Sequence, residues 1–293
     1  MFGKVVIYGV GLMGGSLGLA LHSRGLAKSV WGMGRNYERL KEACRLGVVT
    51  HCTIDRAEAL ENADIVVVCV PVNLIPETVA DLATLAPATA LITDVGSTKA
   101  GVVAQIDQLL PENAPAFIGS HPMCGSEQTG FSAATADLYQ DATVVVTPNS
   151  TSHNDAVTRV SQLWTSVGGN VLLLSPDEHD SLAARTSHLP RTIATALCHA
   201  LEREMNAESR DLMVSTGFLG ASRTALGDIE NWTHILLSNA DHVLDALGDL
   251  QGALNSLHHF LAGGNSEGLR HWLMEGAEIR KRLADSVPIA RRG

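Results

Sequence analysis

The sequence predicts an α/β protein, with a doubly wound parallel sheet covered by helices on both faces and followed by an all-helical domain. Up to residue 174, short runs rich in β-branched residues alternate with segments of helical period, which is typical of strands joined by crossover helices. After Ser175-Pro176 the strand signals stop and the pattern stays helical. Because single cores rarely grow past about 250 residues, we expect two domains, over residues 1–174 and 175–293.

Seven runs in the first domain have the composition of strands. They are Lys4–Tyr8, Ser29–Met33, Ile65–Val70, Leu91–Asp94, Ala116–Ser120, Thr143–Thr147 and Asn170–Leu174. The run Ile65–Val70 shows no polar alternation. We therefore expect it to be a central strand that is buried on both faces.

The first predicted strand is followed by Gly9-Val10-Gly11-Leu12-Met13-Gly14, the Gly-x-Gly-x-x-Gly pattern of a dinucleotide-binding turn. Gly9 would permit the tight turn, Gly11 would let the backbone approach a pyrophosphate, and Gly14 would let helix and strand pack closely. The amides that begin the next helix, at Leu12 and Met13, would face the phosphates. Placed between a strand and a helix, the motif predicts a Rossmann domain that binds NAD or NADP.

The end of the second predicted strand bears on the choice of cofactor. A Rossmann fingerprint usually has Asp or Glu there, which binds the ribose hydroxyls of NAD. Here Gly34 takes that place and Arg35 follows. The lost carboxylate and the added cation favour the 2′-phosphate of NADP. NAD stays an alternative, because Arg35 can also stack on adenine or stay solvated.

Composition argues against several functions. A formal net charge of −10 does not suit nucleic acid, which needs basic surface. The five cysteines form no Cys-x-x-Cys pair, so we expect reduced thiols and no metal site. No apolar run reaches the ~20 residues of a membrane span, and the N-terminus has no secretion signal. We therefore expect a cytoplasmic protein with no membrane partner.

The clearest helical signal lies between Ile229 and Leu261. Apolar residues recur there at alternating spacings of three and four, namely Ile229, Trp232, Leu236, Ala240, Val243, Leu247, Leu250, Leu254, Leu257 and Leu261. The pattern predicts one helix of about nine turns. Such a helix is longer than the second domain needs for its own core, so we expect part of its apolar seam to pack on a second subunit in a homodimer. Burial within one chain is the alternative.

Two further motifs follow predicted strands. Asp94-Val95-Gly96-Ser97-Thr98-Lys99 comes at the end of one, and Gly119-Ser120-His121-Pro122-Met123-Cys124-Gly125-Ser126-Glu127 at the end of the next. Strand ends on this side of a doubly wound sheet point into the ligand crevice. We expect Val70, Pro71 and Asp94 at the cofactor, and His121 as a proton acceptor opposite the nicotinamide.

The run around His121 resembles the Gly-Ser-His-Pro-(Met/Ile)-Ala-Gly-(Thr/Ser)-Glu element of the prephenate and arogenate dehydrogenases of tyrosine biosynthesis, with Cys124 in place of the usual Ala. Three later segments extend the resemblance over nearly the whole chain. They are Ser187–Pro190, Gly217–Arg223 and Asp228–Trp232. Gly220 replaces an Asp found in several relatives, so that contact is absent here or is supplied differently.

The resemblance implies roles for single residues. His121 is the catalytic base, and Ser97 lies beside the cofactor and forms a hydrogen bond with His121. Ser97 or Thr98 could instead cap the next helix. The implied substrate-binding residues are Ser126, Glu127, His188, Arg191, Arg223 and Trp232. Arg223 corresponds to the arginine that grips a substrate carboxylate, which suits a bidentate guanidinium. Arg191 stands where some relatives have His, and either binds a carboxylate or points to solvent.

The implied reaction is the NAD(P)-dependent oxidative decarboxylation of prephenate to 4-hydroxyphenylpyruvate. Three alternatives remain: an enzyme for arogenate, a broad cyclohexadienyl dehydrogenase that accepts both prephenate and arogenate, and an enzyme for 4-amino-4-deoxyprephenate. They remain because these molecules differ at atoms that the sequence does not identify. A β-hydroxyacid dehydrogenase or imine reductase would lack the Gly-Ser-His-Pro run. A non-catalytic dinucleotide sensor would need neither the histidine nor the arginines.

Overall fold

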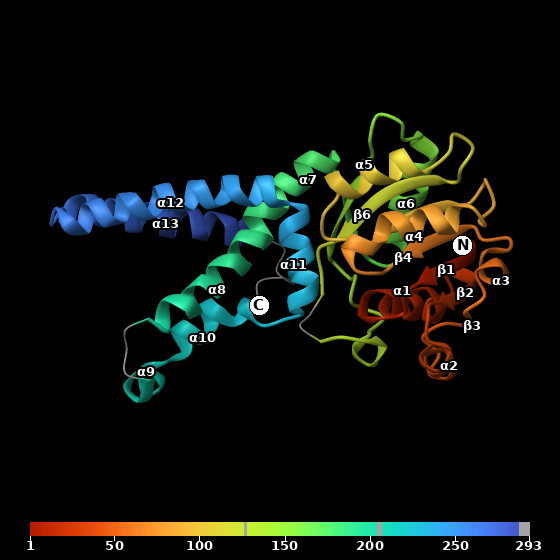
Figure 1. The fold of residues 1–293 in the computed structure, drawn as a ribbon, viewed down its shortest axis with the longest axis horizontal. Helices are drawn as coiled ribbons and strands as arrows, with labels where there is room; N and C mark the ends of the chain where they lie inside the picture. Colours follow the sequence, from red (N-terminus) through yellow and green to blue (C-terminus); the bar gives the residue numbers. More distant parts are fainter. Residues whose placement is uncertain (126–127, 204–206, 287–293) are drawn as a thin grey trace. The chain divides into compact units, whose positions relative to one another are not determined.

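The computed structural model describes residues 1–125, 128–203 and 207–286 (Figure 1). In this part of the chain, eight strands form one sheet in the order β3-β2-β1-β4-β5-β6-β7-β8. The strands are β1 (Phe2–Tyr8), β2 (Ala27–Met33), β3 (His51–Thr53), β4 (Ile65–Val68), β5 (Leu91–Asp94), β6 (Ala116–Pro122), β7 (Thr143–Thr147) and β8 (Asn170–Leu173). The strand order reverses between β1 and β4, which places the ligand crevice at the end of β1.

The sheet departs from the sequence prediction in two places. Strand β3 was not predicted, because its three residues lie at an edge and pair only with β2, too short a run to show a strand pattern. The sheet is mostly parallel, as the sequence predicted, but β6 and β7 pair antiparallel. Parallel neighbours need a long crossover, usually a helix. The connection between β6 and β7 contains only the 3₁₀ turn η2 (Phe131–Ala133) among its described residues.

The core of the sheet lies on β4, as predicted. All four of its residues are fully buried. Ile65 and Val67 face one apolar cluster, and Val66 and Val68 face another on the opposite side. Full burial of such a side chain stabilises the fold by roughly 1.5–3 kcal/mol.

Helices cover both faces of the sheet (Figure 1). In the first 174 residues they are α1 (Leu12–Ser23), α2 (Tyr37–Arg45), α3 (Arg56–Leu60), η1 (Val72–Leu74), α4 (Ile75–Ala83), α5 (Ala100–Leu109) and α6 (Asn154–Ser166). The later ones are α7 (Pro176–Ala183), the π-turn η3 (Ala184–His188), α8 (Leu189–Leu201), α9 (Ala207–Met213), α10 (Thr216–Ser222), η4 (Arg223–Ala225), α11 (Ile229–Ser238), α12 (Ala240–Ala262) and α13 (Ser266–Ser286). Helix α7 begins with a capping box between Ser175 and Glu178.

By its contacts the chain divides into two compact units, residues 1–240 and 241–293. Helices α7 to α11 therefore belong to the same unit as the sheet. One reason is the carboxylate of Asp180 on α7, whose two oxygens accept the backbone N–H groups of Lys99 and Ala100 at the start of α5, each at 2.8 Å. A second reason is the hydrogen bond between the hydroxyl groups of Thr98 and Ser238, whose oxygens are 2.9 Å apart.

The predicted helix from Ile229 to Leu261 is wrong as a single element. It breaks at Asn239, whose backbone leaves the helical region at φ −124° and ψ 30°. The side chain of Asn239 is buried, and its amide nitrogen donates to the backbone oxygen of Asp180 at 2.8 Å and faces Nδ1 of His188 at 3.2 Å. These contacts with a segment that is distant in sequence stabilise the break. The spacing of apolar residues in the helix does not reveal such contacts.

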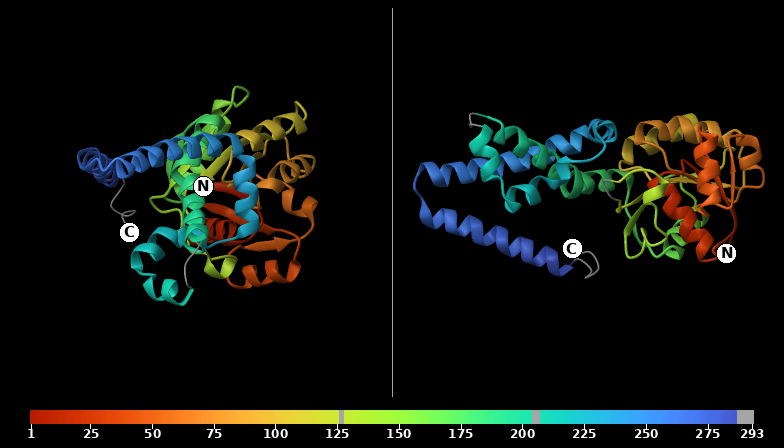
Figure 2. Two further views of the ribbon diagram at one scale, coloured as in Figure 1. Left: turned by 60° about the vertical axis from the view of Figure 1, so that its left-hand side comes forward. Right: turned by 90° about the horizontal axis from the view of Figure 1, so that it is seen from below.

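The second unit contains most of α12 and all of α13. Beyond the turn that joins them, α13 diverges from α12 (Figure 2). Large apolar side chains on both helices are exposed, among them Leu244, Leu254, Leu261, Leu273 and Met274. In the described part of the chain, no helix is both long and apolar enough to cross a membrane.

Candidate active site

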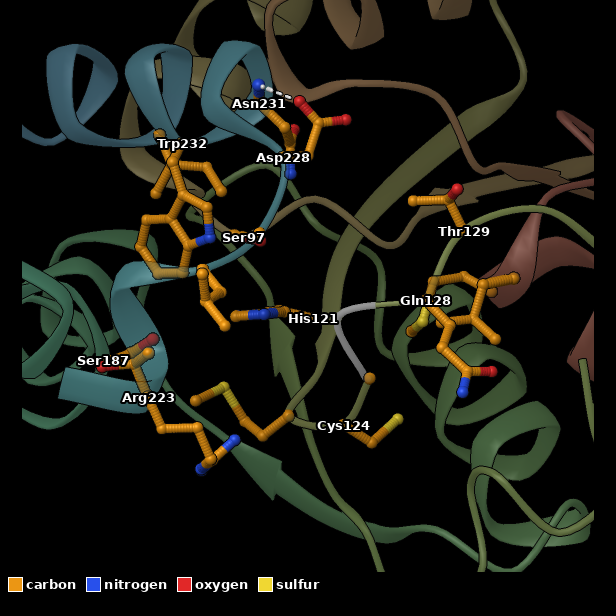
Figure 3. A pocket seen from close by; sticks show the side chains of 18 of the residues that line it. Ser97, His121, Cys124, Gln128, Thr129, Ser187, Arg223, Asp228, Asn231 and Trp232 are labelled. Atoms are coloured by element: carbon orange, nitrogen blue, oxygen red, sulfur yellow. Dashed lines mark hydrogen bonds between the residues drawn. The ribbon is translucent and has the colours of Figure 1, made fainter. Parts of the chain in front are cut away.

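A cavity of about 670 Å³ opens beside the end of β6. Its walls come from the start of α1, the loop after β5, His121 with the segment that follows it, η3, and the stretch from η4 to α11. Figure 3 shows these side chains pointing into one space, with His121 near its centre. Such a volume is typical of a small-molecule site.

The glycine turn at one end of this region fits a dinucleotide. Gly9 has φ +100°, and a Cβ there would clash with the backbone oxygen of Cys69, while a Cβ on Gly14 would clash with that of Gly9. Gly11, in contrast, faces open space and caps α1 with no side-chain hydrogen bond. The turn therefore leaves room and amide donors for a pyrophosphate. Leu12 and Met13 line the cavity itself.

The space around Gly34, at the end of β2, is open. The prediction that a 2′-phosphate binds there needs such a space. A Cβ on Gly34 would meet only the side chain of Leu40, at 3.8 Å. Arg35 is exposed. Arg39, one turn further along α2, is also exposed, with its guanidinium directed at Gly130. Neither arginine has an ion pair with another described residue. Sequence reasoning missed Arg39, although a second arginine four residues after Arg35 was a usable signal.

Two more expected cofactor residues, Val70 and Pro71, follow β4. Val70 lies against the glycine turn, 3.4 Å from the position of a Cβ on Gly9, and Pro71 is exposed. Asp94 differs from the expectation, because it is fully buried. Its carboxylate is paired with the ammonium group of Lys99 and accepts the backbone N–H groups of Gly96 and Ser120. Asp94 is therefore a buried ion-pair partner beneath the site and has no surface for a cofactor.

His121 stands at one end of a chain of buried hydrogen bonds. Its Nδ1 lies 2.8 Å from Nε2 of His179, and Nδ1 of His179 lies 2.7 Å from Oδ1 of Asp180. Burial, together with His179, Lys99 and His188, holds the pKa of His121 well below its ordinary range. The imidazole is therefore neutral near pH 7 and can accept a proton.

Ser97 lines the cavity, but no hydrogen bond joins it to His121 in the structure, whose Nδ1 is turned to His179. Capping of α5 by Ser97 or Thr98 is not observed either. The helix begins after Lys99 without a side-chain cap of its own, and Asp180 serves that purpose from α7. The sequence did not reveal His179 and Asp180, which adjoin the predicted domain boundary and match no local motif.

The lining also includes Arg223, Asp228, Asn231 and Trp232. Arg223 is the one Arg or Lys among the described lining residues, and no ion pair in the described chain engages it. Asp228 caps α11 by accepting the backbone N–H of Asn231 at 3.0 Å (Figure 3). The cavity lining thus includes a guanidinium and a carboxylate.

His188 and Arg191 lie against Trp232 and do not line the cavity. His188 is buried, its ring meets Trp232 edge-on at 6.1 Å, and burial lowers its pKa to about 4. The guanidinium of Arg191 lies over the ring of Trp232, with Cζ 5.2 Å from the ring centroid, and donates to the backbone oxygens of Thr224 and Leu226. Both side chains support Trp232. Ser126 and Glu127 lie outside the described residues, whereas Cys124 and Gln128 beside them line the cavity.

A Rossmann turn, a neutral buried histidine and a cavity with one guanidinium define a dinucleotide-dependent dehydrogenase. Residues 17–173 match the nucleotide-binding domain of prephenate dehydrogenase, and residues 175–275 match its dimerization domain. The chain belongs to the prephenate dehydrogenase family. The two matched segments meet at residue 174, whereas the compact units divide at residue 240.

Named relatives agree. The chain is 29% identical to the prephenate dehydrogenase of Bacillus subtilis, over 99% of this chain and 77% of the relative. It is 29% identical to the cyclohexadienyl dehydrogenase of Zymomonas mobilis, over 97% of each. The prephenate dehydrogenase of A. aeolicus, solved with hydroxyphenyl propionate and NAD+, has a TM-score of 0.90 and 29% identity, over 97% of this chain and 99% of that one. Synechocystis arogenate dehydrogenase has a TM-score of 0.84 and 28% identity, over 96% and 99%.

The buried pair beneath the site makes a prediction about stability. Lys99→Met removes the ammonium group and leaves the Asp94 carboxylate buried without its counter-charge, so the free energy of unfolding should fall by about 3–5 kcal/mol. Denaturant titration followed by circular dichroism measures this change. Lys28→Met, at an exposed lysine, is the control and should change little. A loss of about 1 kcal/mol or less for Lys99→Met, the size expected of a surface pair, contradicts the assignment.

Proposed function

We propose that this chain catalyses the NAD(P)-dependent oxidative decarboxylation of prephenate to 4-hydroxyphenylpyruvate. The observation that carries the proposal is the position of the buried imidazole of His121 in a cavity that both the start of α1 and Arg223 line. A base, a hydride acceptor and a carboxylate anchor are the three groups that this reaction needs.

The chain's own residues perform three tasks. His121 accepts the proton of the substrate's C4 hydroxyl. A nicotinamide held at the glycine turn would supply the acceptor for the hydride from C4, and loss of carbon dioxide from C1 would aromatise the ring. Arg223 holds a substrate carboxylate, and Trp232 forms the wall beside it. The fixed positions of these groups orient C4 before the reaction begins.

Arogenate is a second candidate, and Asp228 favours it. Arogenate carries an ammonium group where prephenate carries a ketone, and the carboxylate of Asp228 lies on the cavity wall. A carboxylate near the substrate side chain attracts an ammonium group and gives a ketone no hydrogen-bond donor.

The reaction can be tested directly. With prephenate and with arogenate, we expect carbon dioxide release equal to the amount of cofactor reduced. His121→Asn keeps the side chain's size but removes the base, so kcat should fall roughly 10²–10⁴-fold with cofactor affinity unchanged. Absorbance of the reduced cofactor and trapped carbon dioxide give both quantities.

The matched control is His199→Asn, an exposed histidine on α8 away from the cavity, which should keep wild-type rates. Absence of turnover with both substrates would overturn the proposed reaction. A His121→Asn enzyme within a few-fold of wild type would move the role of base to another group.

We infer further that the cofactor is NADP. Gly34 leaves space at the ribose. Arg35, just before α2, and Arg39, in its first turn, offer two exposed guanidinium groups. A 2′-phosphate carries charge that such groups bind, whereas the diol of NAD gains from a carboxylate that is absent here.

The ratio of kcat/KM for the two cofactors tests this preference. Wild type should favour NADP, and Gly34→Asp, which the open space at residue 34 accommodates, should reverse the preference by placing a carboxylate against the phosphate. Arg39→Gln should weaken NADP use and leave NAD use nearly unchanged. Lys41→Gln, on the same helix, is the control. A wild type that favours NAD tenfold would refute the inference.

The assembly that we propose is a homodimer formed through the helical domain, in a cytoplasmic enzyme. The support is the exposed apolar side chains of α12 and α13, since isolated monomers seldom leave so many large aliphatic groups in water, and the match to a dimerization domain. The described cysteines form no disulfide, which suits a reducing compartment.

Sedimentation equilibrium should give twice the 31.0 kDa monomer mass at micromolar concentration. Leu254→Glu puts a charge on the exposed apolar face of α12 and should raise the dissociation constant at least about tenfold, because burying an unpaired charge is costly. Gln251→Glu, one turn away and exposed, is the matched control. A wild type that sediments as a monomer would rule out the dimer.

A further inference from the structure

Three buried side chains behind the cavity form a continuous line of hydrogen bonds. His179 and Asp180 are consecutive on α7, and His121 is the residue before the last in β6. The exposed fractions are 1% for Asp180, 2% for His179 and 9% for His121. The two imidazole rings stand at 70° to each other with centroids 5.1 Å apart. The rings therefore do not stack, and Nδ1 of His121 can form a hydrogen bond with Nε2 of His179.

The direction of each hydrogen bond follows from the groups around Asp180. Its two oxygens already accept the fixed backbone N–H groups of Lys99 and Ala100. A carboxylate that only accepts must receive the hydrogen from Nδ1 of His179. Neutral His179 then has no hydrogen on Nε2, which therefore accepts from Nδ1 of His121. The hydrogen of neutral His121 is fixed on Nδ1, and Nε2 keeps its lone pair.

We propose that His179 and Asp180 are positioning residues for the proton acceptor. They hold the tautomer of His121 that leaves Nε2 unprotonated, and the carboxylate of Asp180 stabilises the ring after it has taken a proton. This inference rests on the proposed function, because the proton in question comes from the substrate's hydroxyl group. When Nε2 gains that proton, His121 becomes an imidazolium that still donates from Nδ1 to His179, and the negative charge of Asp180 lies one ring away.

The charges around His121 explain why it needs such partners. Burial and the neighbouring Lys99, His179 and His188 all oppose a positive charge on the ring. Lys99 is itself paired with Asp94, and Arg223 and Asp228 line the same cavity as His121. Among the described residues, Asp180 is the acidic residue that contacts His179. Its carboxylate therefore offsets the cost of forming the imidazolium.

Substitutions at residue 179 separate the hydrogen bond from packing. His179→Gln keeps an acceptor for the Nδ1 hydrogen of His121, whereas His179→Leu, of similar size, has none. We expect kcat to fall at least about tenfold further in His179→Leu than in His179→Gln, with KM for the cofactor unchanged in both. His199→Gln is the control that should keep wild-type rates. Equal rates in the two variants would overturn the proposal, since packing alone would then account for the effect.

The pH profile of kcat/KM gives a second readout. The unprotonated form is active, so the rate falls as pH drops through the pKa of His121. Asp180→Asn removes the counter-charge, lowers that pKa and should shift the acid limb to lower pH. An unmoved acid limb in folded Asp180→Asn would contradict the proposal.

A third measurement does not depend on turnover. Nitrogen-15 NMR of histidine-labelled protein, with His121 assigned by comparison with His121→Asn, should show a protonated Nδ1 and an unprotonated Nε2 in wild type and in His179→Gln. In His179→Leu the ring should lose this preference. A wild-type His121 protonated at Nε2 would overturn the inference. The expected tautomer in a protein that turns over no substrate would instead contradict the proposed function and leave the positioning intact.

Discussion

The carboxylate of Asp180 is the contact on which the arrangement of the site depends. Both oxygens accept backbone N–H groups that open α5, so a negative charge meets the positive end of that helix. The same carboxylate binds His179, and the backbone oxygen of Asp180 accepts the amide of Asn239. One residue of α7 therefore fixes the start of α5, the proton acceptor and the break before α12.

Beneath the histidines lies a second buried polar layer in which the partners are closely matched. The hydroxyl of Ser120 donates to the backbone oxygen of Asp94, and it receives the indole N–H of Trp164 at 2.9 Å. Lys99 adds a donor to the backbone oxygen of Ser120 at 3.1 Å. Fully partnered groups of this kind make a rigid floor, because each alternative arrangement would leave a buried polar atom unpaired.

The sequence was a good guide wherever the determinant is local. The glycine turn, the buried strand Ile65–Val68 and the start of α7 at Ser175-Pro176 each depend on neighbouring residues, and each was predicted close to its observed bounds. The family could also be recognised, because its motifs are short and contiguous. The end of a strand likewise identified His121 as a residue of the cavity wall.

Features that depend on distant partners were not predictable. His179 lies 58 residues from His121 in sequence, and Asp180 lies 81 residues from Lys99. Asp94 was assigned to the cofactor because its place at a strand end does not tell whether the carboxylate is already paired. Asn239 broke a helix that its apolar spacing favours, since the hydrogen bonds that stabilise the break come from α7 and η3.

The antiparallel pairing of β7 has a consequence for how the enzyme meets its substrate. Strand β5 pairs with β6 only as far as Ile118, and β7 pairs with the next four residues, from Gly119 to Pro122. The backbone that carries His121 is thus part of a hydrogen-bonded ladder and not of a loop. Its conformational entropy is lost when the protein folds, so none of the binding energy of the substrate is needed to order the base.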